Sequence, residues 1–208
     1  MPERLHTARI RDRLAGTRMP ADPLDVDFTH LGNRLPESVI GRLRPALRAA
    51  GVLIPLIERT GDLRMLLTQR APDLRHHAGQ VSFPGGGMEA GDADIGATAL
   101  REAREEVGIL PSQVEVAGYL APTATITGFA VTGVVGFIDP AFEPKLDPCE
   151  VEALFEVPVG FLMDEKNAAY SERVYEGQRV PVVSFDYEGH RIWGATAGII
   201  LALRKLLY

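Results

Sequence analysis

The chain has one cysteine in 208 residues, Cys149, so an intrachain disulfide and a cysteine-built zinc cluster are both excluded. It also lacks any apolar run long enough for a transmembrane helix. Residues 1–16, MPERLHTARIRDRLAG, have no apolar segment of the kind found in a signal peptide. We therefore expect a cytoplasmic protein without a membrane partner.

Positive charge is also scarce. Lysine and arginine number 22 against 28 aspartates and glutamates, which gives a net charge of −6. Such a balance provides no basic surface for nucleic acid, so no nucleic-acid partner is expected. An anionic substrate would need a local cation, and a metal site would supply one.

The hydrophobic content of 46% suits one globular domain with a sizeable core. We expect an N-terminal helix and irregular arm over residues 1–45, and the main domain over residues 46–208. Apolar patterns there predict strands at 52–57, 63–68, 114–120, 131–138, 151–158, 180–187 and 190–193, and helices at 94–107 and 196–207. This order predicts an α/β fold in which a mixed β-sheet is sandwiched between α-helices.

Residues 79–109 combine a short strand, a glycine-rich turn, an acidic loop and a helix. The turn, Pro84–Gly87, ends the strand and permits backbone angles that other residues avoid. Asp92 or Asp94 is expected to cap the helix N-terminus, and Gly108 its C-terminus.

The predicted helix carries three carboxylates, Glu102, Glu105 and Glu106, on one arc beside an apolar stripe. Like charges at this spacing repel each other, and a divalent cation among them would remove the repulsion. Mg²⁺ and Mn²⁺ prefer such oxygen ligands. The alternative is an ordinary solvated acidic face, but the glycine-rich turn beside the helix favours a metal or phosphate site.

This stretch resembles the Nudix box, G-x5-E-x7-R-E-U-x-E-E-x-G-U, where U is aliphatic. The second half of the pattern is filled in order by Arg101, Glu102, Ala103, Glu105, Glu106, Gly108 and Ile109. The first half departs from it. Asp92 best fills the loop acid but lies one residue too far from Arg101, and the strict spacing selects Ala93 instead.

A second signature lies upstream. Residues 66–71, LLTQRA, are followed by Arg75, Gly79 and the sequence Phe83–Gly86. This spacing resembles the motif of the coenzyme A-cleaving branch of Nudix hydrolases. The resemblance implies the Nudix fold. It also implies metal-dependent hydrolysis of the coenzyme A diphosphate bond to 3′,5′-ADP and 4′-phosphopantetheine, with Mg²⁺ or Mn²⁺ as cofactor.

The resemblance also implies residue roles. Metal ligands would be the three helix glutamates and the carbonyl of Gly86. The general base would be Glu105, or Glu102 through metal-bound water, and an acid outside the box is the alternative: Glu150, Glu152 or Glu156. Arg70 and Arg75 would bind the diphosphate through their guanidinium groups. Arg101 would support the loop through Asp92 or Glu89.

Other readings stay open. The substrate could be another nucleoside diphosphate derivative, such as ADP-ribose, NADH or a dinucleoside polyphosphate, or the chain could be a Nudix-like binding module without turnover. Three aromatic residues could stack on adenine, although core packing is favoured for each: Tyr119, Phe129 and Trp193. A homodimer is also left open.

Overall fold

The computed structural model describes residues 6–28, 37–74, 77–175 and 177–208. Its centre is a hairpin of β1 (Arg48–Arg59) and β2 (Asp62–Arg70). The hairpin turn contains Thr60 and Gly61, both with positive φ, and lies between the predicted strands 52–57 and 63–68. β1 is buried over most of its length because its side chains are apolar on both faces.

A mixed sheet is built on this hairpin. β1 runs parallel to β7 (Phe129–Ile138), whereas its pairings with β2 and β4 are antiparallel. The main path of the sheet is β3-β2-β1-β7-β5, and β4, β6 and β8 pair with β1, β7 and β2. The remaining strands are β3 (Val81–Ser82), β4 (Gly85–Gly87), β5 (Val114–Tyr119), β6 (Thr123–Ala124) and β8 (Val151–Pro158).

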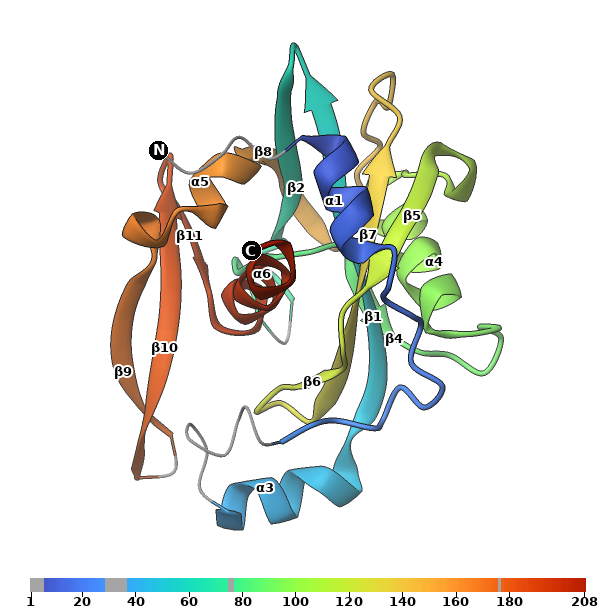
Figure 1. Ribbon diagram of the computed structural model, residues 1–208. Helices are drawn as coiled ribbons and strands as arrows, with labels where there is room; N and C mark the ends of the chain where they lie inside the picture. Colours follow the sequence, from blue (N-terminus) through green and yellow to red (C-terminus); the bar gives the residue numbers. More distant parts are fainter. Residues whose placement is uncertain (1–5, 29–36, 75–76, 176) are drawn as a thin grey trace.

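Helices cover both faces of the sheet (Figure 1). α4 (Ile95–Val107) packs on one face, where its buried alanines meet Leu53 and Ile57 of β1. α1 (Thr7–Leu14) and α6 (Gly194–Leu207) pack on the other, against Ile54 and its neighbours. The alternation of β1 side chains between the two faces therefore builds two cores, and the predicted sheet between helices is confirmed.

A small antiparallel sheet lies beyond α6, which separates it from the main sheet (Figure 1). Its strands are β9 (Ala169–Tyr175), β10 (Gln178–Tyr187) and β11 (His190–Trp193). The β10–β11 hairpin turns at Glu188 and Gly189, between the predicted strands 180–187 and 190–193. The sequence did not predict β9, because the side chains of residues 170–174 are exposed on both faces and give no apolar alternation.

The segment before β1 departs from expectation. Residues 37–50, ESVIGRLRPALRAA, hold a broken helical pattern with Pro45 inside it. In the structure the helix α3 (Glu37–Leu43) ends before a 3-10 turn, η1 (Arg44–Ala46), that contains Pro45. Residues 48–50 already belong to β1, where they pair with both β4 and β7. The division into an arm, 1–45, and a main domain, 46–208, stays a prediction. No helix in the described ranges has the length and apolar character needed to cross a membrane.

Candidate active site

The loop before α4 approaches the sheet more closely than a side chain would allow. A Cβ on Gly85 would lie 2.5 Å from the carbonyl oxygen of Gly51. α4 then starts at its N-cap Asp94, whose carboxylate accepts the N–H of Ala97 at 2.8 Å. It ends at Gly108, which has the left-handed φ of 80° typical of a C-cap. Of the two predicted N-caps, Asp94 is therefore the cap.

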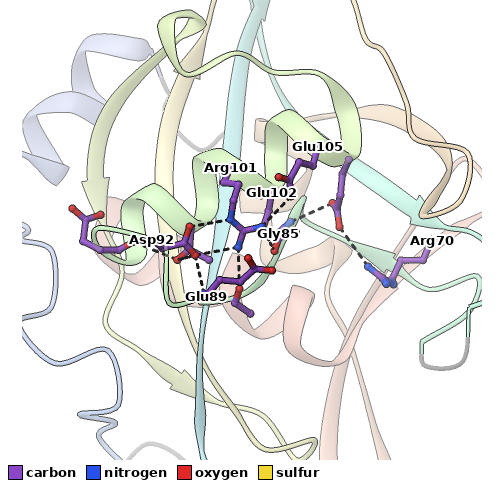
Figure 2. A network of polar contacts seen from close by, with 11 residues as sticks. Arg70, Gly85, Glu89, Asp92, Arg101, Glu102 and Glu105 are labelled. Carbon is purple, nitrogen blue, oxygen red and sulfur yellow. Dashed lines mark hydrogen bonds and ion pairs between the residues drawn. The ribbon is translucent and has the colours of Figure 1, made fainter.

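Asp92 instead anchors Arg101 (Figure 2). Its two carboxylate oxygens accept Nε and Nη2 of Arg101 at 2.9 and 3.1 Å. The backbone N–H of Glu89 and the hydroxyl of Thr98 donate to the same carboxylate. The Arg101 hydrogen bond is the main reason why the pKa of Asp92 falls to about 2. The predicted contact between Arg101 and Asp92 is confirmed, and Glu89 contributes its backbone rather than its side chain.

Arg101 links this loop to the helix carboxylates. Its guanidinium donates to the carbonyl of Gly87 at 3.1 Å, and to Glu102 and Glu105 at 2.9 and 3.0 Å. Hydrogen bonds to Asp92, Glu102 and Glu105 raise the pKa of Arg101, and the bond to Asp92 contributes most. One side chain therefore sets the distance between the glycine loop and two of the three helix glutamates.

The Asp92 anchor predicts a stability effect. Asp92→Asn is expected to lower the free energy of unfolding by about 1–3 kcal/mol, because the variant leaves a half-buried guanidinium and a loop N–H without their carboxylate. Asp94→Asn is the matched control, since asparagine caps helices as well as aspartate and should cost less than about 0.5 kcal/mol. Urea unfolding of both variants measures the difference, and equal losses would contradict the anchoring role.

Glu102 lies against the glycine turn. Its carboxylate sits where a Cβ on Gly86 would be, with Oε1 2.5 Å from that position. The side chain is 15% exposed, and its burial is the main cause of a raised pKa. Glu105, in contrast, is 55% exposed. The structure thus places the Glu102 carboxylate against the backbone of Gly86, and the role of both as metal ligands stays a prediction.

This contact predicts that Gly86 tolerates no side chain. Gly86→Ala is expected to push the Glu102 carboxylate aside and lower kcat at least about tenfold, since small displacements in a site have large effects on rate. A Cβ on Gly91 meets nothing within 4 Å, so Gly91→Ala is the control. Steady-state kinetics measures kcat for both variants. Equal losses in Gly86→Ala and Gly91→Ala would refute a catalytic role for the contact between Gly86 and Glu102.

Glu106 is the buried member of the trio, with 3% of its side chain exposed. It accepts the N–H of Gly85 at 3.2 Å, and its Oε1 lies 3.6 Å from Nη1 of Arg70. Burial raises its pKa to about 8, and the charges of Glu150 and Glu102 act in the same direction. In the described part of the chain, Nε of Arg70 is buried without a hydrogen-bond partner.

The other predicted phosphate-binding arginine, Arg75, lies outside the described residues. Among the three acids considered as a base outside the box, only Glu150 has a charge that acts on Glu102 and Glu106. Glu152 accepts a hydrogen bond from Gln69, and Glu156 pairs with Arg59. No local sequence signal separates these three acids. The pairing of β8 with β2 places Glu152 and Glu156, and Glu150, just before β8, accepts the N–H of Ala71 through its carbonyl.

The donor set suits a hard divalent ion. Glu102, Glu105 and Glu106 offer only oxygen ligands, and Mg²⁺ and Mn²⁺ prefer oxygen. Within the described ranges, no three acidic, histidine or cysteine side chains are already gathered around a common point. Arg101 holds two of the glutamates and Arg70 the third. These arginines act to lower the pKa values of Glu102 and Glu106, and burial is the main cause that raises both.

Solved structures and sequences of known proteins were found to be similar to this chain. Solved structures that resemble it include a Caenorhabditis elegans Ap4A hydrolase binary complex, with 19% identity, coverage of 55% of this chain and 82% of that one, and a TM-score of 0.46. Another is the NUDIX domain of Shewanella oneidensis NrtR complexed with ADP ribose, with 17% identity, coverage of 65% and 84%, and a TM-score of 0.44. Similarities this low say nothing of the substrate.

Sequence relatives are closer. Proteins of Escherichia coli O1:K1 / APEC and Shigella boydii serotype 18, both named "Uncharacterized Nudix hydrolase NudL", are 45% identical over 156 residues, which cover 75% of this chain and 81% of theirs. A profile of the NUDIX domain matches residues 47–176, more than half of the chain. The chain therefore belongs to the Nudix hydrolase family.

Proposed function

We propose that the chain hydrolyses the diphosphate bond of coenzyme A or its derivatives to 3′,5′-ADP and 4′-phosphopantetheine. The observation that carries this proposal is the contact between the half-buried Arg70 and the buried Glu106. Arg70 belongs to the upstream signature and Glu106 to the Nudix box. In this proposal Arg70 binds the substrate and Glu106 holds the metal ion, and their contact would join the two functions.

Nudix hydrolases generally use divalent metal ions such as Mg²⁺ or Mn²⁺. In this chain Glu102, Glu105, Glu106 and the carbonyl of Gly86 would hold the ion. When bound, such an ion neutralises phosphate charge and lowers the pKa of a bound water.

The arginines have separate roles in this proposal. The guanidinium of Arg70 would bind diphosphate oxygens, since its side chain is 23% exposed and a guanidinium matches such oxygens well. Arg75 would be a second clamp. Arg101 acts as a positioning residue, because its hydrogen bonds go to the loop and to the helix carboxylates.

Glu105 is our first choice for the general base. It is the most exposed carboxylate of the trio, so water can reach it, whereas Glu106 is enclosed. Glu102 acting through metal-bound water is the second choice. Glu150 is the strongest choice outside the box because its charge acts on Glu102 and Glu106.

The test is a substrate comparison in Mg²⁺ or Mn²⁺. We expect kcat/KM for coenzyme A or acetyl-coenzyme A to exceed that for ADP-ribose by more than about tenfold. Mass analysis of products formed in ¹⁸O-labelled water identifies which phosphorus the water attacks. A preference for ADP-ribose, NADH or a dinucleoside polyphosphate would overturn the coenzyme A assignment, and binding without turnover would overturn the enzymatic one. The cytoplasmic location and a homodimer stay predictions.

A further inference from the structure

Arg48, the first residue of β1, is an exposed cation, and among the described residues its side chain has no ion pair. Its guanidinium lies 4.3 Å from the centre of the Phe129 ring on the neighbouring strand β7. The N–H of Arg48 donates to the carbonyl of Gly128 at 3.0 Å, which fixes the backbone at this point. A guanidinium stacked on a ring keeps its N–H donors in its own plane. Arg48 is therefore held in place with its donors available to an anion.

The Phe129 ring also borders the glycine strand β4. A Cβ on Gly87 would lie 4.0 Å from Cε1 of Phe129, which is ordinary contact distance. A Cβ on Gly86, the preceding residue, would instead meet the Glu102 carboxylate. Because successive residues of a strand face opposite sides, Phe129 and Glu102 lie on opposite faces of β4. Since β4 consists of glycines, no side chain of its own separates the two faces.

One edge of β4 joins these two faces. In the described part of the chain β4 pairs with β1 and with no other strand. Side chains of α4 bind the backbone of β4 instead. The N–H of Gly85 donates to Glu106 at 3.2 Å, and the carbonyl of Gly87 accepts Arg101 at 3.1 Å. The groups of the candidate active site therefore gather at an edge with no neighbouring strand, and a diphosphate bound there is one glycine backbone away from the face that carries Arg48.

We propose that Arg48 binds the 3′-phosphate of coenzyme A where the substrate crosses this edge. The inference rests on the proposed function and adds a residue that selects the substrate. Arg70 and Arg101 already pair with glutamates, so a further phosphate requires a further cation. In coenzyme A a single ribose joins the 3′-phosphate to the diphosphate, so a cation one strand away from the metal site is close enough. The pantetheine end is neutral beyond the diphosphate and gains nothing from Arg48.

The test compares coenzyme A with dephospho-coenzyme A, which lacks only the 3′-phosphate. The wild type is expected to prefer coenzyme A. Arg48→Gln should lower kcat/KM for coenzyme A by about tenfold, mainly through KM, because a charge-assisted hydrogen bond is lost. The loss on dephospho-coenzyme A should be much smaller, so that the preference collapses. Equal losses on both substrates, or none on either, would overturn the inference.

Arg11→Gln is the matched control. Arg11 is also exposed and stacks on a ring of β7, but at the other end of the strand, 4.5 Å from the centre of the Phe137 ring. This variant removes a stacked guanidinium far from β4 and should keep the preference for coenzyme A. A collapse of the preference in both variants would show that Arg48 acts through stability alone and would overturn the inference.

Calorimetry in Mn²⁺ separates this inference from the proposed function. The wild type is expected to bind 3′,5′-ADP about tenfold more tightly than AMP, which lacks the 3′-phosphate, and Arg48→Gln should bind the two alike. This pattern without hydrolysis of coenzyme A would overturn the proposed function alone. The same preference for 3′,5′-ADP in both proteins, or none in the wild type, would overturn the role of Arg48 alone.

Discussion

Glu106→Gln is expected to lower kcat by at least about a hundredfold at saturating Mg²⁺, the scale of losing an electrostatic or acid–base contribution. Glutamine has the size of glutamate and can still accept the N–H of Gly85. It cannot balance Arg70 or bind a cation as a carboxylate does. The expected result is therefore a folded chain with little turnover, and Glu105→Gln should behave in the same way.

Glu143→Gln is the matched control, because Glu143 is exposed and lies outside the site. Its kcat should equal that of the wild type. Circular dichroism and thermal unfolding of all three variants check that the fold is intact. Turnover of Glu106→Gln near that of the wild type would count against the metal assignment.

The metal-free protein is expected to lose stability as the pH rises from about 4.5 to about 8. The Glu106 carboxyl ionises near 4.5 in the unfolded chain, but only at about 8 in the folded protein, where burial opposes its charge. In this window the folded state holds one more proton than the unfolded state, so raising the pH favours unfolding. The contribution of Glu106 to the free energy of unfolding is fully present below about pH 4.5. It falls by about 1.4 kcal/mol per pH unit and is lost as the pH rises through about 8.

Denaturant unfolding in a chelator, repeated across this pH range, measures the effect. Glu106→Gln should lack this part of the pH dependence. Because all other groups contribute equally to both proteins, the difference between their pH profiles isolates the contribution of Glu106. Saturating Mn²⁺ should flatten the wild-type profile, because a bound cation stabilises the ionised carboxylate. Parallel profiles for the wild type and Glu106→Gln without metal would show that burial does not protonate Glu106.

Local patterns in the sequence predicted several parts of this site. The helix was expected over residues 94–107 and spans Ile95–Val107, because its apolar stripe and Gly108 are read from neighbouring residues. The contact between Arg101 and Asp92 followed from the loop acid that the Nudix pattern requires, despite the extra residue in the spacer. That extra residue is accommodated because the hydroxyl of Thr98 and the N–H of Glu89 hold the Asp92 carboxylate in place.

Other features depend on contacts between distant segments, which a single sequence does not display. The three glutamates share one arc of α4, yet Glu106 is buried against Arg70 while Glu105 faces solvent. This difference arises from the strands and loop that pack beside the helix. The position of Glu150 depends on a contact between distant segments, in which its carbonyl accepts the N–H of Ala71. Trp193 was assigned to core packing, but it lines a pocket that forms only when the small sheet meets β2.

Anomalous diffraction from crystals soaked in Mn²⁺ is the most direct measurement of the central claim. The account predicts a peak beside Glu102, Glu105 and Glu106, within coordination distance of at least two of their carboxylates and near the Gly86 carbonyl. It also predicts that Arg101 keeps its contact with Asp92. The absence of any peak at saturating Mn²⁺, with the three carboxylates turned toward bulk solvent, would contradict the claim that this flank of α4 holds the ions of a diphosphate hydrolase.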